Sequence, residues 1–241
     1  MRDREIDQIL ELAAQGRHDV EPAVLQGIAG SIKPSMGPVR PLPPRWRLAS
    51  GLILICASVA LAGAARAGFY GIEKMTVGER VLIFPALAIL AWLAAAEFVS
   101  EMIPGSRRRM APGALLGIGS LVLLGLFAVL FRDYRTDHFV SAGIVCLMTG
   151  LLHAVPTGLV AWWLLRRGFA VNSVTAGFVG GTLAGLAGVA MLELHCDNFQ
   201  ALHLLVWHTA VVPVSGAAGA LLAWALRYRT SSGVRKGAAP R

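Results

Sequence analysis

The sequence predicts an all-α, polytopic membrane protein, with six transmembrane helices in one bundle and a short helical N-terminal tail. Hydrophobic residues make up 56% of the 241 residues and charged residues only 15%, whereas a soluble domain carries about 25% charged residues. The mean hydropathy is +0.63. Six long apolar runs are present, and together they account for most of the chain as a single helical bundle.

The N-terminal tail, residues 1–47, is polar and is predicted to contain two short amphipathic helices. The second helix follows Pro22, a residue type that is favoured at helix starts. Such short helices bury too little surface to fold alone, so they either lie on the membrane or bind a soluble partner. The tail ends in a proline-rich spacer before the membrane. The two apolar faces consist of Ile6, Ile9, Leu10, Val24, Leu25 and Ile28.

The six apolar runs are long enough to cross a bilayer. A helix rises about 1.5 Å per residue and the hydrocarbon core is about 30 Å thick. The transmembrane domain is therefore expected at 48–226, followed by a basic C-terminal tail at 227–241. The predicted spans are residues 48–65, 81–103, 113–131, 140–165, 174–194 and 204–226.

Small residues at four-residue spacing predict close helix packing in three of these spans. The fifth span has Gly177, Gly181 and Gly185 in this pattern, the sixth has Ser215 and Gly219, and the third has a glycine pair at positions 113 and 117. We interpret these patterns as ordinary contacts within the bundle.

The distribution of positive charge predicts that both termini lie in the cytoplasm. With six spans the termini share one side, and that side holds 17 of the 22 Lys and Arg residues. The tails contribute seven and five of them, while the connections alone hold five on each side, so the tails decide the orientation. Cytoplasmic segments of membrane proteins carry this excess. The net charge of +8 is thus a sign of topology, and no direct nucleic-acid partner is expected.

The stretch from residue 193 to residue 208 concentrates reactive side chains and is predicted to face outward. Titratable groups are costly near the hydrocarbon core, so such a cluster indicates a functional site. The alternative is a polar loop with interfacial anchors. The stretch holds three of the six histidines, one of the three cysteines and two carboxylates, namely Glu193, His195, Cys196, Asp197, His203 and His208.

Two chemistries are open for this cluster. Cys146 lies six residues into the fourth span, about 9 Å below the outer surface. It can therefore share the outer leaflet with Cys196. Thiols on that side can oxidise or bind a thiophilic metal, whereas Cys56 in mid-span is expected to be inert packing. For a metal centre, His203 and His208 are predicted to point about 140° apart on an α-helix, which disfavours one ion shared by both unless the helix starts after His203.

A set of motifs occurs in order along most of the chain. It consists of Pro38 to Trp46, Cys146, Pro156, Leu164-Leu165-Arg166-Arg167-Gly168, Ala176-Gly177, Leu194-His195-Cys196, His203 and Trp207-His208. In these motifs the chain resembles the NrsF-like integral membrane anti-sigma factors. The resemblance covers most of the chain, and the Arg-Arg-Gly connection and the His-Cys…Trp-His pattern are its more specific parts. One departure from the family pattern is Asp197, at a position where proline is usual.

This resemblance implies a negative regulator that holds an extracytoplasmic-function sigma factor at the bacterial inner membrane. An outer-side stress signal, a heavy metal or an oxidant, would release the sigma factor. Cys146 and Cys196 match the family's presumed sensing cysteines, and the same two residues are the candidate metal ligands. His195, His203, His208 and Glu193 are candidate auxiliary ligands or thiol-tuning groups. No resident cofactor is expected, only transient binding of a heavy metal as the signal.

Two other classes of function were weighed against this one. A small transporter or channel needs polar groups along mid-membrane, where His153, Thr149 and Thr157 are the candidates. A membrane enzyme built on the histidine cluster lacks paired ligands at a preorganising spacing. We therefore predict a protein that binds and senses rather than an enzyme.

Overall fold

A computed structural model describes residues 43–103, 105–106, 110–167 and 172–236, together with a few single positions before residue 43. The chain divides into two units, residues 1–42 and 43–241, and the account below concerns the second. The apolar faces predicted in the tail lie outside the described residues; they are Ile6, Ile9, Leu10, Val24, Leu25 and Ile28.

The described part of the second unit is helical, and six of its helices are long and apolar enough to cross a membrane. The predicted spans are found to within about four residues, except that α10 continues well past residue 226. The predicted all-α bundle is therefore confirmed. Its elements are α3 (Arg45–Ala67), α4 (Tyr70–Lys74), α5 (Val77–Met102), α6 (Pro112–Leu130), α7 (Phe139–Arg167), α8 (Ser173–His195), α9 (Ala201–His203), the π-helical turn η2 (Leu204–His208) and α10 (Thr209–Lys236).

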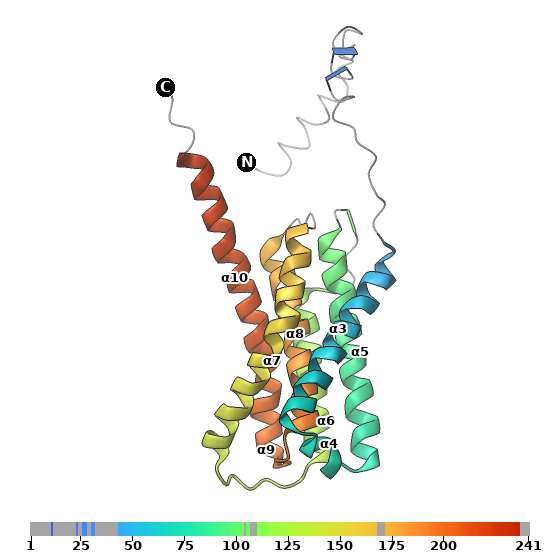
Figure 1. Cartoon of the computed structure of the whole chain (residues 1–241), viewed down its shortest axis with the longest axis vertical. Helices are drawn as coiled ribbons and strands as arrows, with labels where there is room; N and C mark the ends of the chain where they lie inside the picture. The colour runs from blue at the N-terminus through green and yellow to red at the C-terminus, as the bar shows by residue number, and fades with distance from the viewer. Residues whose placement is uncertain are drawn as a thin grey trace. The chain divides into compact units, whose positions relative to one another are not determined.

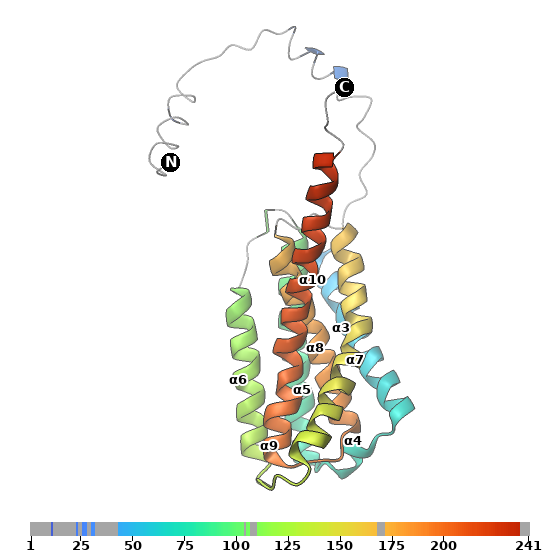
Figure 2. The ribbon, with the colours of Figure 1, turned by 90° about the vertical axis from the view of Figure 1, so that its left-hand side faces the viewer.

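Helix α8 is the centre of the bundle and contacts α10, α7, α3 and α5 (Figures 1 and 2). Of its membrane-spanning window, 78% is buried, against 22–44% for the other five spans. A helix buried all round must be apolar or small all round. The sequence of α8 meets this need with glycine, alanine and leucine on every face.

Glycines set the distance between α8 and its neighbours. A methyl group added at Gly177 would lie 2.5 Å from the carbonyl oxygen of Gly219, and one at Gly185 would lie 2.8 Å from Cα of Val212. Gly181 is pressed in the same way against the carbonyl oxygen of Ser215. The small-residue stripes predicted in the fifth and sixth spans thus pack against each other, as close backbone approach requires.

The corresponding prediction for the third span was wrong. Nothing lies within 4 Å of a methyl group placed at Gly113 or Gly117. Helix α6 instead turns a different stripe inward, which includes Leu115, Leu123 and Phe127. Larger side chains at the matching helical spacing decide which face is buried, and a pair of glycines four residues apart does not.

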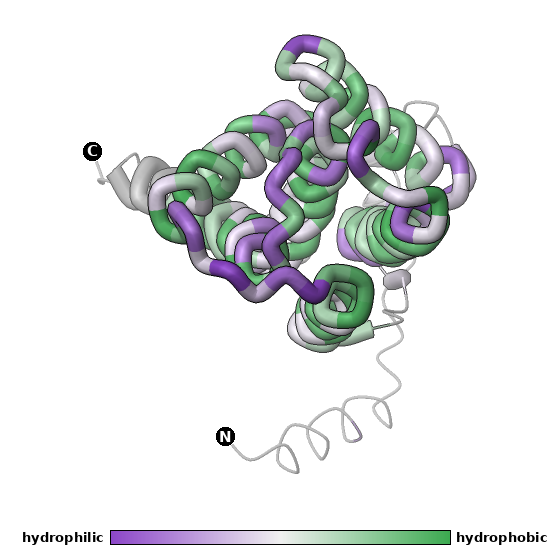
Figure 3. Tube along the Cα trace, turned by 90° about the horizontal axis from the view of Figure 1, so that it is seen from below, coloured by the Kyte–Doolittle hydropathy of each residue, from purple (hydrophilic) through white to green (hydrophobic). Residues whose placement is uncertain are grey.

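The two ends of the bundle differ in what they carry. The end at the bottom of Figure 1 holds α4, α9 and the loop between α6 and α7, and we call it the site end. Seen from this end, the polar parts of the chain gather mainly on the connections between helices, while the helices are largely apolar (Figure 3). Polar connections flanking apolar helices are the pattern expected of a membrane-spanning bundle.

Helix α4 packs directly on the end of α8. It follows a turn at Gly68, whose φ of 108° is accessible mainly to glycine. A methyl group at Gly71 would lie 2.6 Å from the carbonyl oxygen of Glu193 and 2.7 Å from that of Cys196. The next helix, α5, then begins with a capping box between Thr76 and Glu79. Together these features hold the last turn of α8 in place.

Candidate functional site: a cluster of two thiols and two histidines

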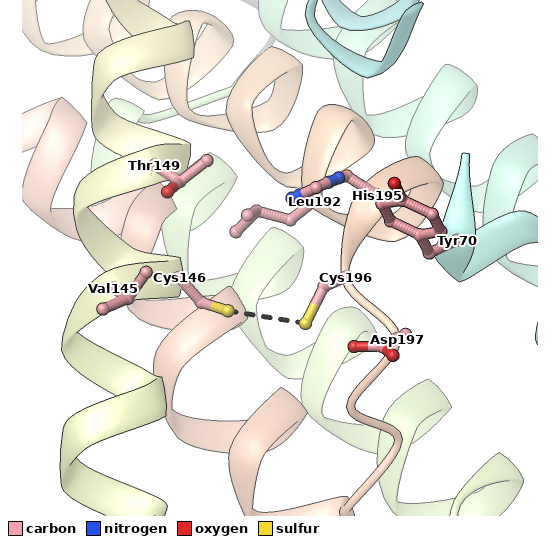
Figure 4. Close-up of a pocket in the computed structure, with 8 residues that line it drawn as sticks. All are labelled: Tyr70, Val145, Cys146, Thr149, Leu192, His195, Cys196 and Asp197. Atoms are coloured by element: carbon pink, nitrogen blue, oxygen red, sulfur yellow. Dashed lines mark hydrogen bonds between the residues drawn. The ribbon is translucent and has the colours of Figure 1, made fainter. Parts of the chain in front are cut away.

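The two cysteines predicted to share one leaflet meet at the site end. Cys146 lies in the second turn of α7 and Cys196 directly follows α8, and their Sγ atoms are 3.4 Å apart (Figure 4). Both cysteines are free thiols. Cys196 is buried and Cys146 half-buried. Residues 50 positions apart in the chain are thus brought into contact by the packing of α7 against α8.

His203 and His208 lie together with the thiols, contrary to the prediction that they point apart. The prediction assumed an α-helix, but residues 204–208 form the π-helical turn η2, in which the amide of Thr209 donates to the carbonyl of Leu204. Hydrogen bonds from residue i+5 to residue i bring side chains five apart onto one face. The two imidazole rings are accordingly 5.3 Å apart, centroid to centroid.

The four side chains form one compact cluster. Nε2 of His203 lies 3.7 Å from Sγ of Cys196. One candidate ligand atom from each of Cys146, Cys196, His203 and His208 can be chosen so that all four lie within 4.8 Å of one another. Both histidines are fully buried, at 0% and 1% exposure. The cluster therefore has the atoms and the spacing to react with, or bind, a small thiophilic species.

Glu193 orients one of the histidines. In α8 its carboxylate Oε1 accepts a hydrogen bond from Nδ1 of His208 at 2.7 Å, and both side chains are at most 1% exposed. A carboxylate in such a place is retained only when it is paired. Nε2 of His208 and Nδ1 of His203 have no hydrogen-bond partner among the described residues.

The other two titratable residues of the stretch, His195 and Asp197, lie outside this cluster. Nδ1 of His195 lies 3.1 Å from the carbonyl oxygen of Gly68, and its ring packs on Tyr70. Asp197 forms an exposed ion pair with Lys74 at 2.8 Å. The structure thus separates His195, an auxiliary ligand candidate, from His203, His208 and Glu193.

A cavity of about 390 Å³ leads to the thiols. His195 and Asp197 line it beside the two cysteines, as Figure 4 shows. Small solutes can reach the sulfur atoms by this route. Sequence reasoning predicted Cys146 of α7 at this site but missed Tyr70 of α4 and Val145 of α7, because no local pattern reports which distant helix faces a given side chain. The full lining is Tyr70, Val145, Cys146, Thr149, Leu192, His195, Cys196 and Asp197.

Two groups just beyond the spanning helices have shifted pKa values. The hydrogen bond with the Cys146 thiol, followed by burial, raises the pKa of Cys196, while His203 opposes this shift. The hydrogen bond from Lys74 lowers the pKa of Asp197. At neutral pH the Cys196 thiol is therefore protonated and slow to react until a metal or base removes its proton.

These features define a class of protein: a polytopic membrane protein whose bundle carries a buried thiol and histidine cluster at one end. The model of the family described as "NrsF: Negative regulator of sigma F" matches residues 34–228. The chain therefore belongs to this family of negative regulators of a sigma factor, as the resemblance had indicated. The match includes every residue of the cluster and begins after the two predicted apolar faces of the tail. No curated protein and no solved structure gives a significant match.

Proposed function

We propose that this protein is an anti-sigma factor of the bacterial inner membrane. It holds an extracytoplasmic-function sigma factor at the cytoplasmic face and releases it when a heavy metal or an oxidant reaches Cys146 and Cys196. Membership of a family of negative regulators of a sigma factor supports the regulatory role. The observation that carries the sensing role is the 3.4 Å contact between the two thiols at the end of a cavity.

The charge distribution supports an orientation with the thiols on the outer side. Cys146 and Cys196 lie at the site end, opposite the start of α3 and the end of α10. The segments before α3 and after residue 226 are rich in Lys and Arg, and such segments stay in the cytoplasm. A stress signal arriving from outside would then meet the cavity first.

The N-terminal tail is the proposed docking element for the sigma factor. An amphipathic helix seeks an apolar groove on a soluble partner, and Ile9 and Leu25 lie on the two predicted faces. The membrane bilayer is the second partner of the protein, and no direct contact with nucleic acid is required of it.

Helix α8 is proposed to transmit the signal from the two thiols to the cytoplasmic end of the bundle, from which the N-terminal tail starts. It ends at the thiols and begins at the opposite end of the bundle, and its glycine face packs tightly on α10. Tightly packed interfaces shift between discrete arrangements rather than deform gradually. A ligand transmits a signal only when it binds one arrangement better than the other. A bond between the sulfur atoms of Cys146 and Cys196 favours the arrangement of α7 and α8 in which these two atoms lie closer together.

Co-purification tests the docking element. The full-length protein is coexpressed with a candidate sigma factor, taken first from the neighbouring gene, and isolated in detergent. Ile9→Asp or Leu25→Asp is expected to reduce recovery of the sigma factor at least tenfold, because a charge enters the apolar face. Gln8→Asp adds the same charge beside that face and should have little effect. Undiminished recovery with both apolar variants would show that the tail does not dock the sigma factor.

A further inference from the structure

We propose that Cys146, Cys196, His203 and His208 together form a tetrahedral site for one divalent metal ion of the zinc or cadmium type, with Glu193 as its positioning residue. The inference deepens the proposed function, because it assigns a ligand to the sensing site. It rests on that function only where metal binding is said to release the sigma factor. The four-ligand site itself stands on the geometry of the cluster.

The distances between the sulfur and nitrogen atoms suit one small ion. Bonds of about 2.3 Å to sulfur and about 2.0 Å to nitrogen place tetrahedral ligand atoms about 3.3 to 3.8 Å apart. The Sγ atoms of Cys146 and Cys196 are 3.4 Å apart, and Nε2 of His203 is 3.7 Å from Sγ of Cys196. All four ligand atoms lie within 4.8 Å, so closing the site around an ion needs only small side-chain shifts.

The unpartnered nitrogen of His208 points to a missing ligand. Its Nδ1 is held by Glu193 at 2.7 Å, while its Nε2, on a side chain 1% exposed, has no partner among the described residues. A buried polar atom without a partner is costly. Histidines that bind metals characteristically donate their second N–H to a carboxylate. Glu193 fits that role, since it fixes the tautomer that leaves Nε2 free to coordinate.

The π-helical turn is what makes the set of four possible. On a regular α-helix, residues 203 and 208 would face apart, but η2 places both imidazoles against the thiols. Such single π-helical turns occur frequently at functional sites. His195 stays outside the ligand set because its Nδ1 contacts the Gly68 carbonyl.

The charges balance in the loaded site. Binding breaks two S–H bonds and forms two metal–sulfur and two metal–nitrogen bonds, and two protons pass through the cavity to solvent. A doubly charged cation with two thiolates and two neutral imidazoles has no net charge. The remaining negative charge, on the Glu193 carboxylate, is paired with the N–H of His208 at 2.7 Å, as a buried carboxylate requires. Mixed sulfur and nitrogen ligands in a tetrahedral arrangement favour zinc and its soft relatives over magnesium or calcium.

Titration of the purified protein with Co²⁺ and Cd²⁺ tests this site. The full-length protein is reduced and studied in detergent without oxygen. We expect one ion per chain, release of two protons, and with Co²⁺ the intense visible bands of tetrahedral coordination together with thiolate charge-transfer bands. Cys146→Ser, His203→Ala and His208→Ala should each lose the tetrahedral spectrum. Cys56→Ser is the matched control, since Cys56 lies in α3 and does not line the cavity, and it should bind as the wild type does.

Glu193→Gln separates positioning from coordination. It should keep the tetrahedral Co²⁺ spectrum but weaken binding by about 10- to 100-fold, as loss of a carboxylate behind a histidine ligand does, and Glu193→Asp should recover part of the affinity. A purely structural role would leave the affinity of the folded variant unchanged. Elution as a single folded species shows that each variant is intact, and His208→Gln replaces any His208→Ala protein that fails this check.

Two results would overturn the four-ligand site. One is wild-type affinity and spectrum in both His203→Ala and His208→Ala, which would leave a site of two cysteines only. The other is the absence of metal binding by reduced, folded wild-type protein. Neither result depends on the sigma factor, so failure of this inference is distinguishable from failure of the anti-sigma function, which co-purification tests separately.

Discussion

At the scale of single residues, the chemistry of the site depends on what surrounds Cys196. The thiol is 7% exposed, and its hydrogen bond with Cys146 together with burial raises its pKa. The thiolate is the reactive form, so Cys196 itself reacts slowly with oxidants at neutral pH. Cys146 is half-buried and lines the cavity, which makes it the more accessible of the two sulfur atoms.

Alkylation over a range of pH tests this difference. In Cys56→Ser protein, N-ethylmaleimide should modify Cys196 more slowly than Cys146 at neutral pH. Because its pKa is raised, the rate at Cys196 should climb only as the pH passes above the ordinary cysteine value of about 8.5. Mass spectrometry of the two peptides gives both rates, with glutathione as the reference thiol. Faster modification of Cys196 than of Cys146 at neutral pH would contradict the arrangement.

Residue-level prediction from the sequence placed the two thiols together correctly, and it named His203 and His208 as auxiliary candidates but oriented these two side chains wrongly relative to each other. Counting residues along each span placed Cys146 and Cys196 at one depth, since helix rise is nearly constant, and the structure brings them together. The same arithmetic separated His203 from His208, because it assumed an α-helical rotation for residues 204–208. Nothing in the local sequence reported the π-helical turn, which depends on how α10 packs against its neighbours.

At the scale of elements, the packing of α8 on α10 depends on glycine. Gly185→Ala should destabilise the protein by about 1–3 kcal/mol, the usual cost of overpacking a tight contact, because the new methyl would lie 2.8 Å from Cα of Val212. Gly125→Ala on α6 is the control, since nothing lies within 4 Å of a methyl there. Thermal unfolding in detergent measures both. Equal stability of the two variants would show that α8 does not pack on α10 as described.

The six spans were predictable because length and hydropathy alone define a transmembrane helix. Which helices pack against each other was less predictable from the sequence. The glycine patterns correctly indicated close packing in α8 and α10 but did not report that these two helices pack on each other, and they also selected Gly113 and Gly117, which face no other helix. The predicted end of the sixth span at residue 226 agrees with the candidate span Ala201–Leu226, and the helix itself continues past its apolar run to Lys236.

At the scale of the whole molecule, the buried helix α8 connects the proposed sensing cluster to the end of the bundle at which the sigma factor is proposed to bind. The thiol and histidine cluster lies where α8 ends, and α8 begins at the other end of the bundle, the end at which α3 also starts. A bond that joins the two sulfur atoms links α7 to the end of α8, since Cys146 lies in α7 and Cys196 directly follows α8. The same helix contacts α3, which follows directly from the N-terminal segment.

The most direct test of this account is a reporter gene driven by the cognate sigma factor, measured with and without cadmium or a thiol oxidant. The wild type should repress the reporter at rest and release it on treatment. Cys146→Ser, Cys196→Ser and the double variant should still repress, and all three should lose most of the induction to a similar extent, because the two thiols act as one unit. Cys56→Ser should behave as the wild type. Full induction in the double variant would contradict the account.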